Sequence, residues 1–187
     1  MSATGRGDQQ ECFISVDIET AGPVPSSYAI LSIGACLVDD ADQTFYVELQ
    51  PEHTRAVPEA LAVTGLSIDD LMSRGERPQR AMEMFEDWVL SECPAGHRPV
   101  FTAFNAAFDW MFVTDALWRT TGRDPFGHAP LDLKSLFMGR DRLEAWASTT
   151  RHEMLRRYPV PEPHTHHALD DARMQAALAR RLLGDPR

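Results

Sequence analysis

The sequence predicts an α/β fold in which helices flank a mixed five-stranded sheet in three layers. Two observations lead to this prediction: three apolar, strand-like segments follow one another near the N-terminus, and two later ones alternate with helical patterns. The first three segments are typical of an antiparallel meander, and the later ones make the predicted sheet mixed. At 187 residues the chain is most simply one domain. We expect a flexible tail over residues 1–10 and a single domain over residues 11–184.

Each predicted strand is a short apolar segment bounded by turn-forming residues. In the first, apolar residues such as Phe13, Val16 and Ile18 alternate with small or polar ones, and they indicate a central, buried strand. A turn containing Gly22 and Pro23 separates it from the second strand. We expect strands over residues 11–18, 28–38, 44–49, 99–104 and 131–133.

The predicted helices are recognised by their apolar faces and by the residues that end them. The third is the clearest, because Ala81, Met84, Phe85, Trp88 and Val89 fall on one face. Helices are expected over residues 58–62, 68–72, 78–90, 107–120, from the last strand through residue 138, and over residues 141–157 and 167–183. The proline-containing stretch 159–163 separates the expected helix over residues 141–157 from the one over residues 167–183.

Composition limits the setting and the class of protein. Cys12, Cys36 and Cys93 are too few and too scattered for a disulfide framework or a CxxC metal site, so a cytoplasmic location is the default expectation. The longest apolar run, residues 29–38, is too short to span a bilayer, so we expect no membrane partner. The polar N-terminus lacks the pattern of a secretory signal.

The net charge of −10 argues at first sight against a nucleic-acid substrate, because acidic side chains repel phosphate unless metal ions offset them. Residues 139–187, however, carry nine basic and seven acidic side chains. The arginines of this segment flanking the last histidine motif are Arg151, Arg156, Arg157, Arg173, Arg180 and Arg181. They fit an ordinary helix surface better than a phosphate track, although their position keeps the second reading open.

The first chemical motif is Asp17-Ile18-Glu19, near the end of the first predicted strand. Side chains two apart on a strand point to the same face. Two carboxylates on one buried face repel each other unless a cation lies between them, and Mg²⁺ prefers such oxygen ligands. An acidic pair on a solvated edge strand is the alternative, which the apolar flanking residues disfavour.

The second motif is Asn105-Ala106-Ala107-Phe108-Asp109, at a predicted junction between strand and helix. Asn105 is suited to close the turn as a helix cap, and Asp109 falls in the first turn of the helix. A carboxylate there is explained equally well by the helix dipole or by metal binding.

The third motif is His166-His167-Ala168-Leu169-Asp170-Asp171, at the start of the last predicted helix. Asp171 is the better ligand candidate, because its five-residue spacing lets it share a site with a loop histidine. Asp170 is treated as an ordinary acid of a helix start. Zinc binding by His164, His166 and His167 is disfavoured, since no cysteine nearby completes a compact structural site.

Together these motifs resemble those of the DEDDh 3′–5′ exonucleases, which belong to the ribonuclease H-like superfamily with ribonuclease T, oligoribonuclease and the proofreading subunit of bacterial DNA polymerase III. The matching patterns are Asp17-x-Glu19, Asn105-x-x-Phe108-Asp109 and His166-x-Ala168-Leu169-x-Asp171. The resemblance extends over residues 12–183, except that residues 140–164 do not match those relatives well. It implies a ribonuclease H-like fold and a DnaQ-like nuclease.

The resemblance also implies a two-metal mechanism with two Mg²⁺ or Mn²⁺ ions. Asp17, Glu19 and Asp171 would hold one ion, Asp17 would bridge to the second, and Asp109 would support that second site. His166 would be the general base, a role that suits imidazole because its unperturbed pKa lies near neutral pH. The products would be nucleoside 5′-monophosphates cut from the 3′ end of single-stranded RNA or DNA.

Substrate contacts are predicted by position alone, for Thr20, Leu66, Asn105 and Phe108. Two alternatives stay open: a catalytically idle nucleic-acid-binding module, and a phosphodiesterase for very short oligonucleotides, which fits the low positive charge. Because related exonucleases are often dimers, a homodimer is among the expected assemblies. His166 is preferred to His167 as the base by its spacing to Asp171.

Overall fold

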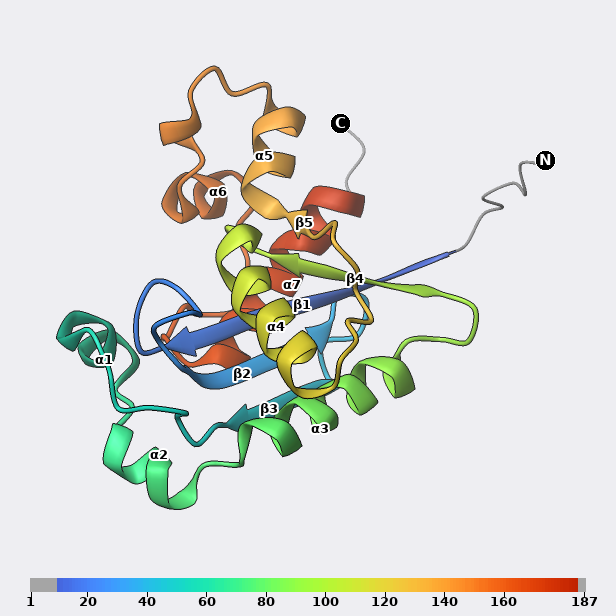
Figure 1. Cartoon of the computed structure of the whole chain (residues 1–187). Coiled ribbons are helices and arrows are strands. Elements are labelled where there is room, and N and C mark those ends of the chain that lie inside the picture. The colour runs from blue at the N-terminus through green and yellow to red at the C-terminus, as the bar shows by residue number, and fades with distance from the viewer. Residues whose placement is uncertain (1–9, 185–187) are drawn as a thin grey trace, which may run out of the picture.

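A five-stranded sheet with the strand order β3-β2-β1-β4-β5 forms the centre of the computed structural model, which describes residues 10–184 (Figure 1). The strands are β1 (Glu11–Thr20), β2 (Ile30–Leu37), β3 (Thr44–Glu48), β4 (Arg98–Ala103) and β5 (Leu131–Asp132). The first three pair antiparallel, and β4 pairs in parallel with both β1 and β5. The predicted mixed sheet is therefore confirmed. Of the expected tail over residues 1–10, all but Gln10 lies outside the described residues.

Helices cover both faces of this sheet (Figure 1). They are α1 (Pro58–Thr64), α2 (Ile68–Arg74), α3 (Pro78–Glu92), α4 (Ala106–Thr120), α5 (Leu133–Asp141), α6 (Arg151–Arg157) and α7 (Ala168–Gly184), with a 3₁₀ turn, η1, at Trp146–Ser148. Within residues 10–184, none of these helices is both long and apolar enough to cross a membrane.

The two faces of β1 belong to two different hydrophobic cores. Ile14, Val16 and Ile18 are buried against α3 and α4. Phe13 packs instead into the core that includes α7, and Ser15 Oγ donates a hydrogen bond to the Ala172 carbonyl of α7 at 2.8 Å. This alternation follows from the two-residue period of a strand. It places the side chains of odd-numbered β1 residues, Asp17 and Glu19 included, on the α7 face.

Gly34 of β2 lets α7 approach the sheet closely. It pairs with Asp17 across the β1–β2 ladder. A Cβ atom at this position would lie only 2.2 Å from the backbone of both Ala168 and Leu169, at the start of α7. Any side chain here would push that helix start away from the sheet, so the absence of one sets the distance between Asp17 and the first turn of α7.

The helix predicted over residues 141–157 is wrong as a continuous element. The α5 helix ends at Asp141 because Arg142 adopts a left-handed backbone conformation, with φ 52°. A short irregular stretch and η1 follow, and α6 begins only after Thr150, whose Oγ1 accepts a hydrogen bond from Glu153 N at 3.1 Å. Thr150 and Glu153 have the spacing of a capping box, a local signal for a new helix start.

Gly34→Ala is expected to destabilise the protein by about 1–3 kcal/mol, the usual cost of overpacking a rigid contact. Gly139→Ala is the matched control, because a Cβ there meets nothing within 4 Å and its backbone is helical. That control should be neutral or stabilising by roughly 0.5–1 kcal/mol. Urea unfolding of both variants checks this, and equal effects at the two positions would contradict it.

Candidate active site

The three sequence motifs meet where β1 ends and where α4 and α7 begin. Asp17, Glu19 and Asp171 offer carboxylate oxygens that all lie within 4.8 Å of one another. Asp109 is buried beside them, and its Oδ1 accepts a hydrogen bond from Ile18 N at 3.2 Å. Four carboxylates from three distant segments therefore line one cleft.

Asp17 and Glu19 of β1 are crowded by other carboxylates, and the pKa values of both are raised. Desolvation, followed by repulsion from Asp109, Asp171 and Glu19, raises the pKa of Asp17 well above its usual range. Desolvation, with repulsion from Asp171 and Asp109, raises the pKa of Glu19 to about 8. Arg151 opposes both shifts. Such a group of acids is a strong attractor for cations.

Asp132, which is not among the residues selected from the sequence, organises the second motif. Asn105 stands at the N-cap position of α4 with φ 67°, and its side chain makes no capping hydrogen bond. Asn105 therefore closes the turn into this helix, as expected, without capping it through its side chain. Asp132 of β5 caps it instead, since its Oδ1 accepts from Ala106 N at 3.1 Å. Parallel pairing of Ala103 with Asp132 brings this carboxylate to the start of α4.

Asp109 lies in the first turn of α4, as predicted. Desolvation raises its pKa to about 7, while hydrogen bonds from the backbone at Ile18 and Asp109 act in the opposite direction. Because one of its oxygens is occupied by Ile18 N, Asp109 offers the cleft less free carboxylate than Glu19 does.

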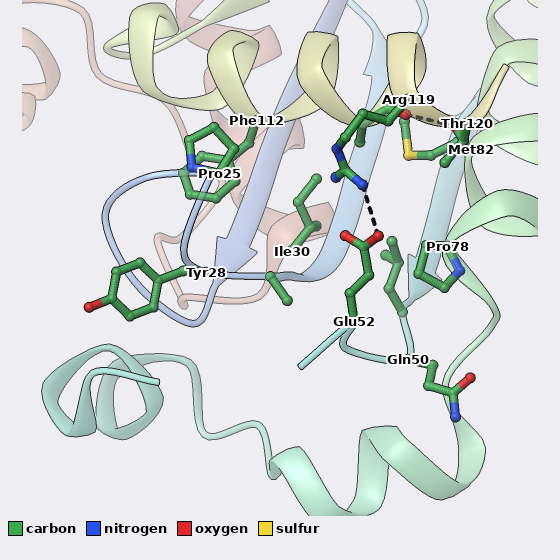
Figure 2. A pocket seen from close by; sticks show the side chains of 13 residues that line it. Pro25, Tyr28, Ile30, Gln50, Glu52, Pro78, Met82, Phe112, Arg119 and Thr120 are labelled. Carbon is green, nitrogen blue, oxygen red and sulfur yellow. Dashed lines mark hydrogen bonds and ion pairs between the residues drawn. The ribbon is translucent and has the colours of Figure 1, made fainter. Parts of the chain in front are cut away.

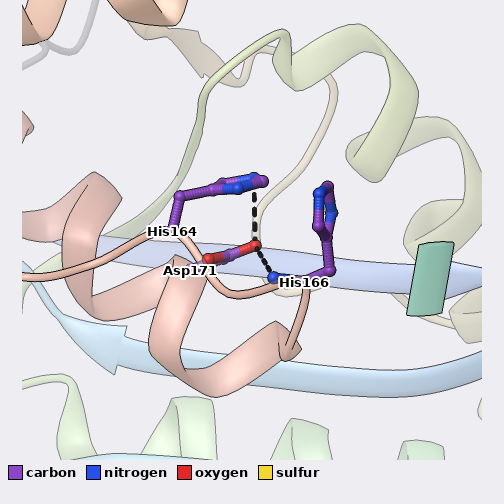
Figure 3. Close-up of side chains that lie close together, drawn as sticks. All are labelled: His164, His166 and Asp171. Atoms are coloured by element: carbon purple, nitrogen blue, oxygen red, sulfur yellow. Dashed lines mark hydrogen bonds and ion pairs between the residues drawn. The ribbon is translucent and has the colours of Figure 1, made fainter. Parts of the chain in front are cut away.

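The loop before α7 wraps around the carboxylate of Asp171 (Figure 3). Thr165 N donates to Asp171 Oδ1 at 2.9 Å, and His166 N donates to Oδ2 at 3.1 Å. His164 Nε2 lies 3.2 Å from the same Oδ2. The backbone of His166 is left-handed, with φ 59°. The two imidazole rings stand edge to face, 4.2 Å apart, on one side of Asp171.

His164 is a site residue that the motif comparison missed. Its imidazole lines the cleft together with that of His166. Burial, with the positive charge of Arg151, lowers the pKa of His164. The sequence contains a signal for His164 as a site residue. His164 and His166 are two positions apart in the loop that leads into a helix.

His167 and Asp170 do not line the cleft. The ring of His167 stacks on Tyr46 of β3, with centroids 4.5 Å apart. Asp170 Oδ2 accepts a hydrogen bond from Thr165 Oγ1 at 3.2 Å, and the residue stays at the helix start. The structure thus places the side chain of His166, and not that of His167, at the cleft.

Gln175 is a second residue missed from the sequence. It is fully buried on α7, one turn after Asp171. Its Nε2 donates to Asp17 Oδ1 at 2.5 Å, and its Oε1 accepts from Phe104 N at 2.8 Å. Gln175 therefore connects α7 to β1 and to the end of β4. A helical i, i+4 relation to Asp171 is the signal that could have found it.

Two basic side chains also line the cleft, Lys134 and Arg151. Lys134 is the single lysine of the sequence. The guanidinium carbon of Arg151 lies 5.0 Å from the centroid of Phe104, and its Nε is buried without a hydrogen-bond partner among residues 10–184. Arg156 and Arg157 instead pair with Glu153, as an ordinary helix surface would. The arginine cluster thus contributes one cleft residue.

Of the four predicted substrate contacts, the cleft includes Asn105 and Phe108. Thr20 is buried, and its Oγ1 donates to the Gly22 carbonyl at 2.9 Å. Leu66 packs with the small core around Leu71. Neither Thr20 nor Leu66 lines this cleft.

Another pocket, near the β1–β2 connection, is unsuited to a ligand (Figure 2). Arg119 and Glu52 pair across it at 2.8 Å. Its cavity volume is about 20 Å³, enough for about one water molecule and too little for a larger ligand. The carboxylate cleft is the stronger candidate, with a cavity volume of about 380 Å³.

The donor set of the cleft fits a hard divalent cation. Asp17, Glu19 and Asp171 supply oxygens, which Mg²⁺ and Mn²⁺ prefer, and their mutual repulsion is relieved when a cation is shared. A second set, His164, His166 and Asp171, also has ligand atoms within 4.8 Å of one another. Two imidazoles and one carboxylate suit softer transition metals as well.

Known nucleases resemble this chain in sequence. Residues 12–183 match a family described as the Rv2179c-like 3′-5′ exoribonuclease domain. The 3′-5′ DNA exonuclease Cap18 of Escherichia coli is 40% identical over 174 residues, which cover 91% of each chain. Ribonuclease T of Shewanella denitrificans is 32% identical over 127 residues, and the match covers 60% of this chain and 55% of that protein.

Solved structures share the fold at low sequence identity. The nuclease domain of 3′hExo, a DEDDh family member bound to rAMP, superposes with a TM-score of 0.75 at 16% identity, covering 94% of this chain and 93% of that one. E. coli Exonuclease I in complex with a dT13 oligonucleotide gives a TM-score of 0.70 at 18% identity, covering 94% of this chain and 41% of that one. The ribonuclease H-like fold expected from the motifs is confirmed by these neighbours.

The raised pKa of Glu19 predicts how stability depends on pH and metal. Because its folded pKa of about 8 exceeds the ordinary 4.5, the folded state retains a proton that the unfolded state releases between these values. The metal-free protein should therefore lose stability as pH rises through this window. Mg²⁺ or Mn²⁺ at a hundred times its Kd should add about 2.7 kcal/mol. Unfolding curves with and without metal, near pH 5.5 and pH 8, test this.

Asp17→Asn is the informative variant for the same measurement. Removing one of the crowded charges should stabilise the metal-free protein near pH 8 and abolish most of the metal-dependent gain. A metal-dependent gain that persists unchanged in Asp17→Asn would show that the ion binds elsewhere.

Proposed function

Because the chain belongs to the Rv2179c-like 3′-5′ exoribonuclease domain family and is a 3′–5′ exonuclease of the DEDDh type, we propose that it hydrolyses single-stranded RNA or DNA from the 3′ end and releases nucleoside 5′-monophosphates. One observation carries this proposal. Asp17, Glu19, Asp109 and Asp171 line a single cleft together with His166.

The proposal assigns the carboxylates to two divalent ions, Mg²⁺ or Mn²⁺. Asp17, Glu19 and Asp171 would hold one ion, with Asp17 shared with the second and Asp109 supporting that second site. When bound, such ions stabilise the attacking and leaving oxygens of an in-line displacement. The hydrogen bonds from Gln175 to Asp17 and from the 165–166 backbone to Asp171 would hold two of these carboxylates in position.

His166 is assigned the role of general base. Its imidazole is exposed on the cleft, whereas that of His164 lies against Asp171 and that of His167 stacks on Tyr46. His166 would take a proton from the attacking water as its oxygen forms a bond to phosphorus. The bond from phosphorus to the 3′ oxygen of the preceding nucleotide then breaks, and that oxygen leaves with the shortened strand.

Lys134 and Arg151 are assigned to the phosphate groups of the substrate. They bring positive charge to a cleft that otherwise carries four acids. The orphaned Nε of Arg151 is a donor suited to a phosphate oxygen, because an unpaired buried donor costs free energy until it is satisfied.

The type of nucleic acid, RNA or DNA, is the most specific question about the substrate. The family description names an exoribonuclease, whereas the E. coli relative at 40% identity is named a DNA exonuclease. The proposal therefore includes both single-stranded RNA and single-stranded DNA as substrates. The discriminating group is the 2′-hydroxyl, which a protein recognises as donor and acceptor.

A second candidate, hydrolysis of very short oligonucleotides, is favoured by the small number of basic side chains in the cleft. With Lys134 and Arg151 as its two cations, few phosphates would be contacted. Binding of single strands would then weaken with salt with a logarithmic slope of roughly −1.4, about 0.7 for each contact.

The central experiment incubates purified protein with 5′-labelled single-stranded RNA, single-stranded DNA and duplex in the presence of Mg²⁺ or Mn²⁺. Stepwise shortening from the 3′ end is expected, and it should disappear in Asp17→Ala and on chelation. Absence of shortening for every strand would refute the proposal. Turnover of dinucleotides against 20-mers in the same assay separates the two candidates, since only the short-substrate enzyme favours dinucleotides.

The neighbouring histidines His166 and His167 provide a matched pair of variants. His166→Ala should lower kcat by on the order of a hundredfold or more, because it removes the base, while the metal-dependent gain in stability is largely kept. His167→Ala should have much less effect, since its ring lies outside the cleft. Steady-state kinetics of both variants decide the assignment, and a larger loss for His167→Ala would reverse it.

A further inference from the structure

We propose that a recess beside the catalytic cleft binds an unpaired nucleobase, that of the nucleotide on the 5′ side of the scissile phosphate, with Trp146 as its stacking surface. The inference rests on the proposed exonuclease function. It adds to that function a subsite for the second nucleotide from the 3′ end.

The recess lies between the start of α4, the start of α5 and the 3₁₀ turn η1. Its lining residues are Asn105, Ala106, Ala107, Trp110, Pro130, Asp132, Ser135 and Trp146. Trp146 is 50% exposed, so much of its indole is open to a ligand. Trp110 is held in place because its Nε1 donates to the Gly127 carbonyl at 3.3 Å. The walls therefore offer two indoles, one of them fixed.

Two polar side chains of the recess, Asp132 and Ser135, are already engaged with each other or with the backbone. Asp132 Oδ1 accepts from Ala106 N at 3.1 Å, and its Oδ2 accepts from Ser135 N at 3.0 Å and from Ser135 Oγ at 2.6 Å. One carboxylate thus caps both α4 and α5. Besides Asn105, the recess presents mainly aromatic and apolar surface to a ligand, which suits a flat base better than a phosphate.

The recess is continuous with the catalytic cleft. Asn105 lines both, and Lys134 of the cleft has its Nζ 4.6 Å from the centroid of Trp146 and 5.7 Å from that of Phe104. The pocket of Figure 2 shares no lining residue with the cleft. A strand whose terminal nucleotide occupies the cleft therefore has this recess as its adjoining apolar surface.

Lys134 lies at the boundary between the catalytic cleft and the recess, and its charge favours a phosphate group of the substrate there. An ammonium group above an indole ring remains available to an anion, because a cation–π contact leaves its other N–H donors free. The phosphate that links the terminal nucleotide to the next one would meet Lys134, and the attached base would then lie over Trp146. Positive charge next to a stacking ring is the usual composition of a single-strand binding surface.

The subsite also gives a role to a segment that the family resemblance left unexplained. Residues 142–150 connect α5 to α6, and they carry Trp146 on one side of Lys134 and lead into Arg151 on the other. The Phe104 ring lies between the two cations, 5.7 Å from Lys134 Nζ and 5.0 Å from the Arg151 guanidinium carbon. Aromatic rings and cations thus alternate from the recess to the catalytic cleft.

The test is a double-mutant cycle between protein and substrate. One substrate is 5′-fluorescein-labelled hexathymidylate, or hexauridylate if the protein degrades only RNA, and the other has an abasic residue at the penultimate position. Release of the first mononucleotide is measured as kcat/KM for wild type and Trp146→Ala. Trp146→Ala should lower kcat/KM about tenfold on the intact strand and less than twofold on the abasic strand.

Two controls accompany the cycle. Trp118→Ala removes another exposed tryptophan, 60% exposed on α4, which does not line the recess, and it should change neither value. Trp146→Phe keeps an aromatic surface and should retain most of the activity on the intact strand. Thermal unfolding of Trp146→Ala confirms that the fold is kept.

The outcomes separate the two ideas. If Trp146→Ala lowers kcat/KM equally on both strands, or on neither, the subsite is overturned while the exonuclease function stands. If the wild type cleaves neither strand, the proposed function fails, and the same cycle is run on dissociation constants from fluorescence anisotropy in EDTA. Loss of the Trp146 effect on the abasic strand in that measurement would still support the subsite, and its persistence or the absence of binding would refute it.

Discussion

The arrangement of this molecule depends on holding several carboxylates together at one end of β1. Asp17, Glu19 and Asp171 repel one another, and a chain that gathers them must compensate for this repulsion. It does so with hydrogen-bond donors: Gln175 to Asp17, Ile18 N to Asp109, and the backbone of residues 165 and 166 to Asp171. Compensation is partial, because the pKa of Glu19 still rises to about 8. The remaining deficit is what a divalent cation would remove.

Close packing of α7 on β2 makes this arrangement possible. With no side chain at Gly34, the start of α7 sits directly on the β2 backbone opposite Asp17. Asp171 and Gln175, one turn apart, then reach the same strand. The site is therefore built by a helix–sheet contact of unusually short range as much as by the acidic residues themselves. A glycine in the middle of a strand is costly unless a close approach of this kind requires it.

Much of this could be predicted from the sequence, for identifiable reasons. The strands and most helices carry strong periodic patterns, and Asp17 and Glu19 share a face because strands have a period of two. What could not be predicted depends on contacts between distant segments. Arg151 appeared to be one of several helix-surface arginines, and Asp132 appeared to be an unremarkable strand residue, until the parallel pairing of β4 with β5 brought the latter to the start of α4. The break after Asp141 was missed because a left-handed Arg142 leaves no pattern that periodicity detects.

Strained backbone conformations also occur beside the cleft. Among the described residues, three that are not glycine have positive φ: Asn105, Arg142 and His166. Two of them, Asn105 and His166, line the cleft, one before α4 and one before α7. Each ends a loop by turning sharply into a helix whose first turn carries a carboxylate, Asp109 or Asp171. Such conformations cost about 1–3 kcal/mol and persist only where the surroundings enforce them. At His166 the surroundings include Asp171 itself, which accepts the His166 N–H, so the same carboxylate proposed to bind metal also holds the proposed base in its strained position.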